Sequence, residues 1–172
     1  MTRRKFFAVA GAGAVMARAA SEAGLAGQVC LFSKHVPDMP YPELARTIKQ
    51  LGFAGVDLTV RPGGHVLPER VVEDLPRAVA ALRKGGVAVP MITTGLTSVD
   101  DPAARPTLVT AARLGIPFYK LGYYRYRTLA ELQATLDRTR REVERLVALG
   151  RETGIQAGFH NHSGTYVGAA VW

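Results

Sequence analysis

The chain has 172 residues, 48% hydrophobic and 21% charged, a composition typical of a globular domain with a sizeable core. Its formal net charge is +8, but Arg3-Arg4-Lys5 and Arg18 supply four of those charges within nineteen residues that contain no acid. Without these four the charge falls to +4, and the remaining basic residues lie beside acids on expected helices. We therefore expect no nucleic-acid partner. Cys30 is the only cysteine, so no intrachain disulfide can form.

Residues 1–27 have the order of features found in an export signal. A basic start, MTRRKFF, precedes a weakly apolar middle, AVAGAGAVMA, and a small-residue exit, ARAASEA. The pair Arg3-Arg4 resembles a twin-arginine signal, which directs the export of folded proteins. The middle is too short and too rich in alanine and glycine for a stable membrane anchor. We therefore predict an exported, periplasmic protein, with a frayed N-terminal helix as the alternative interpretation.

Residues 28–172 alternate between short apolar runs and longer segments with helical periodicity. The apolar runs predict five strands, near Val29–Ser33, Val56–Val60, Val87–Thr93, Phe118–Gly122 and Ile155–His160. Helices are predicted to begin near Pro42, Pro68 and Asp100-Asp101-Pro102, and the clearest helix covers Thr128–Thr153. Glycine accepts the left-handed conformation that ends a helix, and it stands at each expected end: Gly52, Gly86, Gly115 and Gly154.

Strands joined by helices predict one α/β domain with a parallel sheet covered by helices. Two closures fit this pattern. One is an open, doubly wound sheet, and the other is part of a barrel of eight strand–helix units. Polar residues follow every expected strand at its carboxyl end, where both architectures bind ligands. This placement therefore does not distinguish the two closures.

The segment GFHNHSG, from Gly158 to Gly164, contains two of the four histidines. Residues two apart on a strand point the same way, so His160 and His162 are expected to face one side of the sheet. Neutral imidazole binds Zn, Mn, Co or Fe, and two such side chains make half a metal site. Asn161 between them is expected to face the opposite side and to hold the loop or a substrate. The alternative is a polar strand end that hydrogen-bonds to backbone or water.

Three further residues are candidates for ligand contact in the expected strands and loops. His65 follows Gly63-Gly64, which allow a tight turn and a close approach of the backbone to a ligand; a surface loop histidine is equally compatible. Lys120 interrupts an apolar strand and could hold a sugar hydroxyl, a carboxylate or a phosphate. Asp57 also lies in an apolar strand, so it must be paired or hydrogen-bonded, for example with Lys120 or a threonine.

Four stretches together resemble the sugar phosphate isomerase/epimerase family of xylose isomerase-like TIM barrels: VDLTVRPGGHVLPE, VPMITTG, KLGYYRY and FHNHSGTYVGAAVW. The resemblance covers Val29 to Trp172. It implies an α/β fold made of five successive βα units, about the first five of eight. The family's usual metal ligands are Glu, Asp, His and Glu from the last four strands. Only the first of those strands exists here, and it carries His160 where many members have glutamate.

The resemblance implies metal-assisted isomerisation or epimerisation of a small carbohydrate, with a divalent metal such as Mn, Zn, Co or Mg. Taking the resemblance with the residue types and positions above, we predict metal contact by His160 and His162, and substrate contact by His65, Lys120, Asn161 and His162. The family comparison also implies a domain truncated at its C-terminus, so that an open sheet edge promotes homo-oligomers. One alternative function is a non-catalytic fragment that binds a sugar or a partner. A DNA-repair enzyme like endonuclease IV fits less well, because the charge outside the signal is modest.

The export signal can be tested by replacing Arg3-Arg4 with Lys-Lys. We expect this variant to stay in the cytoplasm, because the twin-arginine route reads the arginine pair rather than charge alone. The unchanged protein should lose its first residues at a site between about Ala20 and Gln28, where small residues gather. Cell fractionation and N-terminal sequencing measure both results. Unchanged export of the Lys-Lys variant, in a strain that has only this route, contradicts the prediction.

Overall fold

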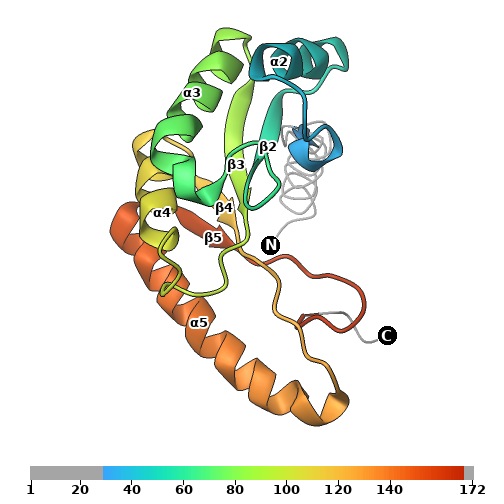
Figure 1. Cartoon of the computed structure of the whole chain (residues 1–172), viewed down its shortest axis with the longest axis vertical. Helices are drawn as coiled ribbons and strands as arrows, with labels where there is room; N and C mark the ends of the chain where they lie inside the picture. Colours follow the sequence, from blue (N-terminus) through green and yellow to red (C-terminus); the bar gives the residue numbers. More distant parts are fainter. Residues whose placement is uncertain (1–28, 169–172) are drawn as a thin grey trace, which may run out of the picture.

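The computed structural model describes residues 29–168, so the predicted export signal lies outside the described part of the chain. Five strands alternate with helices along the sequence (Figure 1). The strands are β1 (Cys30–Phe32), β2 (Gly55–Val60), β3 (Ala88–Thr94), β4 (Phe118–Lys120) and β5 (Gln156–Gly158). The main helices are α2 (Tyr41–Gln50), α3 (Val71–Lys84), α4 (Ala104–Arg113) and α5 (Leu132–Thr153). Short 3-10 turns occupy Ser33–His35, Pro68–Arg70 and Leu129–Glu131.

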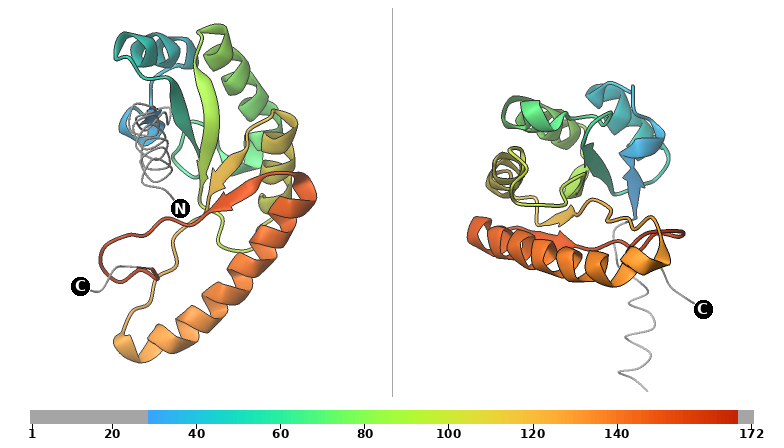
Figure 2. Two further views of the ribbon diagram at one scale, coloured as in Figure 1. Left: turned by 180° about the vertical axis from the view of Figure 1, so that it is seen from behind. Right: turned by 60° about the horizontal axis from the view of Figure 1, so that its bottom comes forward.

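The five strands form one parallel sheet in the order β1-β2-β3-β4-β5. This sequential order confirms the expected five successive βα units and excludes the doubly wound alternative, in which β3 would lie beside β1. Figure 2 shows the sheet as a curved layer with the four main helices on its outer side. No helix of residues 29–168 covers the inner side. β1 and β5 are the two edges of the sheet.

The beginnings of two helices, and the ends of all four, can be read in the sequence. Pro42 lies in the first turn of α2, where its missing N–H costs nothing. Asp101 accepts a 2.8 Å hydrogen bond from the N–H of Ala103 just before α4. All four glycines expected at helix ends have a positive φ, between 69° and 84°, as the left-handed conformation requires.

The core lies between the sheet and the four helices. Tyr119 on β4 is fully buried, and its Oη donates a 2.9 Å hydrogen bond to the carbonyl oxygen of Leu146 on α5. Burial raises the pKa of this phenol to about 12. The other large buried side chains come from both layers: Val56, Leu58 and Ile92 from strands, and Leu44, Leu75, Leu82, Leu108 and Leu146 from helices. This packing buries the outer face of the sheet.

The segments that follow β4 and β5 run side by side away from the sheet (Figure 1). Arg125 and Tyr166 form an antiparallel bridge between them. The N–H of Tyr126 donates to the oxygen of Thr165, and the N–H of Val167 donates to the oxygen of Tyr124. These backbone bonds fix the two segments relative to each other. None of the helices described here is both long and apolar enough to cross a bilayer.

A matched pair of glycines tests how closely the strand ends pack. A Cβ on Gly122 would overlap the carbonyl group of Gly95, whereas a Cβ on Gly95 would have its nearest neighbours at 3.9 Å. We expect Gly122→Ala to lower the free energy of unfolding by about 1–3 kcal/mol, because the backbones must separate. Gly95→Ala should change it by less than about 0.5 kcal/mol. Urea denaturation measures both, and equal effects would contradict this packing.

Candidate functional site

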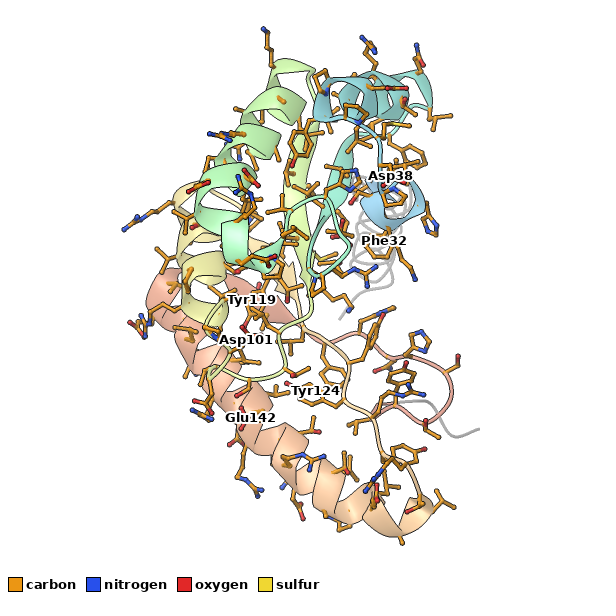
Figure 3. The ribbon with its side chains drawn as sticks, viewed as in Figure 1. Phe32, Asp38, Asp101, Tyr119, Tyr124 and Glu142 are labelled. Carbon is orange, nitrogen blue, oxygen red and sulfur yellow. The ribbon has the colours of Figure 1, made fainter. Side chains whose placement is uncertain are left out.

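The carboxyl ends of the strands surround a cavity of about 380 Å³ on the inner side of the sheet. Its lining includes residues from all five strands or from the segments directly after them. Phe32, labelled in Figure 3, is part of this lining at the end of β1. The polar groups around the cavity come from three strands and from the segments after β4 and β5: Asp57, Thr93, Lys120, Tyr123 and His160. A larger hollow, of about 490 Å³, lies near the beginnings of α3 and α4 and contains none of the predicted site residues.

Asp57 lies on β2 and presents a carboxylate to this cavity. Its Oδ2 accepts a 2.8 Å hydrogen bond from Thr93 Oγ1, which confirms the expected threonine partner. Its Oδ1 is buried and has no hydrogen-bond partner among the described residues. Burial raises the pKa of the carboxyl to about 6, although Thr93, Lys120 and Arg61 all act to lower it. Asp57 therefore offers one unused acceptor to a ligand.

Lys120, at the end of β4, is only 8% exposed. Its Nζ donates a 2.8 Å hydrogen bond to the carbonyl oxygen of Leu121 and lies 3.8 Å from the centre of the Tyr123 ring. Burial lowers the pKa of the amine to about 8, and the positive charges of Arg61 and Lys34 add to this effect. The attraction of Asp57 opposes the shift but does not cancel it.

Tyr123 connects Lys120 to the two predicted metal-binding histidines. Its Oη lies 3.0 Å from His160 Nδ1, within hydrogen-bond distance. The Tyr123 ring packs edge-on against His162, with centroids 5.0 Å apart, and against Tyr166, with centroids 5.4 Å apart. Tyr123 is not among the residues that the sequence predicted to contact a ligand. Its closeness to Lys120 in sequence was the signal that could have drawn attention to it.

The expectation that β5 continues to His160 is wrong. β5 ends at Gly158, because β4 pairs with it over only three residues and the N–H of Leu121 makes the last bond, to Gly158. His160 and His162 therefore lie in the following segment, where strand alternation does not apply. His160 lines the cavity and His162 does not. His162 Nδ1 lies 2.9 Å from the oxygen of Ser163.

Two other predicted substrate contacts lie away from the cavity lining. His65 folds back onto β2, where its N–H donates to Thr59 Oγ1 at 3.0 Å and its Nδ1 lies 3.3 Å from the same oxygen. Burial lowers the pKa of His65. Asn161 is exposed and lies beside Gly168, since a Cβ added to that glycine would come within 2.9 Å of Asn161 Oδ1. The structure thus brings Lys120 and His160 to one cavity and leaves His65 and Asn161 outside its lining.

A complete metal centre needs more ligands than these histidines supply. In residues 29–168, no three His, Cys, Asp or Glu side chains cluster closely enough to hold a metal ion. His160 and His162 together would provide two of the three or four protein ligands that zinc sites use. The described side chains therefore do not form a complete metal site by themselves.

Neither a protein-family model nor a curated protein matches the sequence. Solved structures do match the fold. A 3-keto-D-glucoside 4-epimerase from E. coli has a TM-score of 0.59 at 14% identity, over 81% of this chain and 57% of that one. A D-psicose 3-epimerase from Clostridium cellulolyticum H10, solved with D-tagatose, has a TM-score of 0.54 at 10% identity, over 76% and 51%.

A third match is a xylose isomerase-like TIM barrel protein from Mycobacterium smegmatis in complex with magnesium. Its TM-score is 0.55 at 16% identity, over 80% of this chain and 56% of that one. The chain has the fold of about half of a xylose isomerase-like TIM barrel. It spans between 51% and 57% of the length of these three structures. At such low identity the likeness establishes the fold and not the reaction.

The raised pKa of Asp57 predicts a specific dependence of stability on pH. The folded state binds the Asp57 proton more tightly than the unfolded state, whose carboxyl has a pKa near 3.8. Protonation of Asp57 therefore stabilises the folded state. This stabilisation is fully present below about pH 4 and is lost as the pH rises through about 6. Asp57→Asn removes the titration while keeping the shape. At pH 7 we expect the variant to be more stable than the natural chain by roughly 1–3 kcal/mol.

At pH 4 this difference should largely disappear, because Asp57 is then protonated in the folded state. Urea denaturation at both pH values measures it. Asp38→Asn removes an exposed carboxylate (Asp38 is labelled in Figure 3) and should change stability by less than about 0.5 kcal/mol. A difference that is the same at pH 4 and pH 7 would contradict the assignment.

Proposed function

We propose that this protein binds a small carbohydrate in the cavity at the strand ends and takes part in its isomerisation or epimerisation. The observation that carries the proposal is Asp57, which lines the cavity and whose buried Oδ1 has no hydrogen-bond partner among the described residues. A buried acceptor of this kind is costly unless a ligand supplies a donor, and a sugar hydroxyl is such a donor. The fold shared with solved sugar epimerases supports the choice of ligand.

The other cavity residues suit the same ligand. Lys120 supplies a cation or amine that can bind a sugar oxygen, and His160 supplies a ring nitrogen that can donate or accept a proton. The Tyr123 ring and Phe32 supply apolar surface against which the carbon-bound hydrogens of a sugar can pack. Asp57, with its pKa near 6, can hold or release a proton close to neutral pH.

The divalent metal expected from the family resemblance remains part of the proposal. His160 and His162 are the described side chains proposed to contact it, and further oxygen ligands would have to come from substrate or from other parts of the protein. When bound, such a metal would polarise the carbonyl and hydroxyl oxygens of the sugar. A carbohydrate-binding protein without turnover is the second candidate. It is supported by the same cavity, because binding requires only the groups already described there.

Calorimetry with D-tagatose and other ketoses, with and without Mg²⁺ or Mn²⁺, tests the binding proposal. We expect His160→Gln to weaken binding about tenfold, because one polar partner at the cavity is replaced. His35→Gln is a matched control, since His35 lies outside the cavity lining and should leave binding unchanged. The proposal fails if no ketose binds the natural chain, or if both variants weaken binding equally.

Incubation with the bound ketose in D₂O separates the two candidates. An isomerase or epimerase that moves a proton exchanges the hydrogen on a carbon next to the carbonyl, and NMR detects the incorporated deuterium. Binding without deuterium exchange would support the non-catalytic candidate. Binding with exchange would support the catalytic one.

A further inference from the structure

Lys120 has a setting that differs from the other described lysines. Lys34, Lys49 and Lys84 are exposed, whereas Lys120 is 8% exposed and lines the cavity. Its two close contacts are the carbonyl oxygen of Leu121 and the ring of Tyr123. A neutral amine can still donate to that carbonyl and keeps a lone pair for a ligand. The geometry therefore accommodates Lys120 as a nucleophile.

The charges around Lys120 favour the neutral amine. Burial and the positive charges of Arg61 and Lys34 lower its pKa to about 8, against the opposing attraction of Asp57. At pH 8 such an amine is about half neutral, which is about a hundredfold more than for an ordinary lysine with a pKa near 10.4. Desolvation and neighbouring cations are the two means by which proteins activate lysine for attack on carbonyl groups.

We propose that Lys120 captures the carbonyl carbon of an open-chain sugar, or of a similar small hydroxy-carbonyl compound, as an imine in this cavity. The choice of ligand rests on the proposed carbohydrate function. Capture itself needs only the amine, an acid and space for the ligand. The cavity of about 380 Å³ contains all three, because Asp57 lines it together with Lys120.

The step balances without an oxidant or reductant. Nζ attacks the carbonyl carbon, a C–N bond forms, and a proton moves from nitrogen to the former carbonyl oxygen to give a carbinolamine. Protonated Asp57 then donates a proton to that hydroxyl, which leaves as water, and the protonated imine remains. Its positive charge would lie near the Tyr123 ring, whose face attracts cations. Water reverses the step and releases the carbonyl compound.

Reductive trapping tests this inference on the full chain. The chain is treated with dihydroxyacetone and sodium cyanoborohydride at pH 8, with EDTA present. Cyanoborohydride reduces an imine to a stable secondary amine, so each captured lysine gains a three-carbon unit that peptide mass spectrometry locates. Lys49 and Lys84 of the same molecule are internal controls. We expect Lys120 to be labelled about tenfold faster than either, because its larger neutral fraction outweighs its lower basicity.

Two variants complete the experiment. Lys120→Arg should lose the fast labelling and leave the rates at Lys49 and Lys84 unchanged, with circular dichroism confirming the fold. Asp57→Asn should slow labelling of Lys120, because the acid that expels water is gone. Labelling of Lys120 at the rate of the exposed lysines, or more slowly, overturns the inference.

The outcome is independent of the test of the proposed function. A chain that binds D-tagatose but shows no preferred labelling of Lys120 refutes imine capture alone. A chain that is labelled at Lys120 by dihydroxyacetone but neither binds D-tagatose nor exchanges deuterium into it refutes the carbohydrate function and leaves carbonyl capture standing.

Discussion

Parallel pairing of five consecutive strands is the constraint on which the rest of this structure depends. Parallel strands need a crossover after each one, and a right-handed crossover returns the helix to the same side of the sheet. Repeating that step along the chain places all helices outside and all strand carboxyl ends at one edge. Asp57, Thr93, Lys120 and His160 are far apart in sequence, and this repetition brings them to one cavity.

The cavity keeps two opposite charges in surroundings that favour neither. Burial raises the pKa of Asp57 and lowers that of Lys120, and their mutual attraction only partly offsets both shifts. Burying Asp57 and Lys120 lowers the free energy of unfolding, because each charged group would be better solvated in the unfolded chain. The same surroundings move both pKa values toward neutral pH, where proton transfer and nucleophilic attack are easiest. Thr93 limits the cost by donating a hydrogen bond to Asp57.

Tyr123 links the side chains around the cavity. One side chain contacts the Lys120 amine with its ring face and His160 with its hydroxyl, and its ring packs on His162. These contacts join the segment after β4 to the segment after β5, so they form only when the two segments lie together. Their backbone bonds near Tyr124 and Tyr166 keep them together, so residues 37 apart in sequence, Tyr123 and His160, meet.

The sequence by itself determined the alternation of strands and helices, and the glycines that end the four main helices. Apolar periodicity and glycine at helix ends are local signals, since they depend on backbone conformation within a few residues. It also singled out Lys120, which interrupts an apolar strand, and His160, one of two histidines in a short stretch of a histidine-poor chain.

Only the tertiary structure decided how far the strands extend and which polar residues meet. The end of β5 at Gly158 depends on how long β4 can pair with it, and that length is not encoded near His160. His65 contacts Thr59 on β2 and does not line the cavity, since a tight loop turns it back onto the preceding strand. The central place of Tyr123 and the unused oxygen of Asp57 likewise arise from contacts between distant segments, which no local pattern specifies.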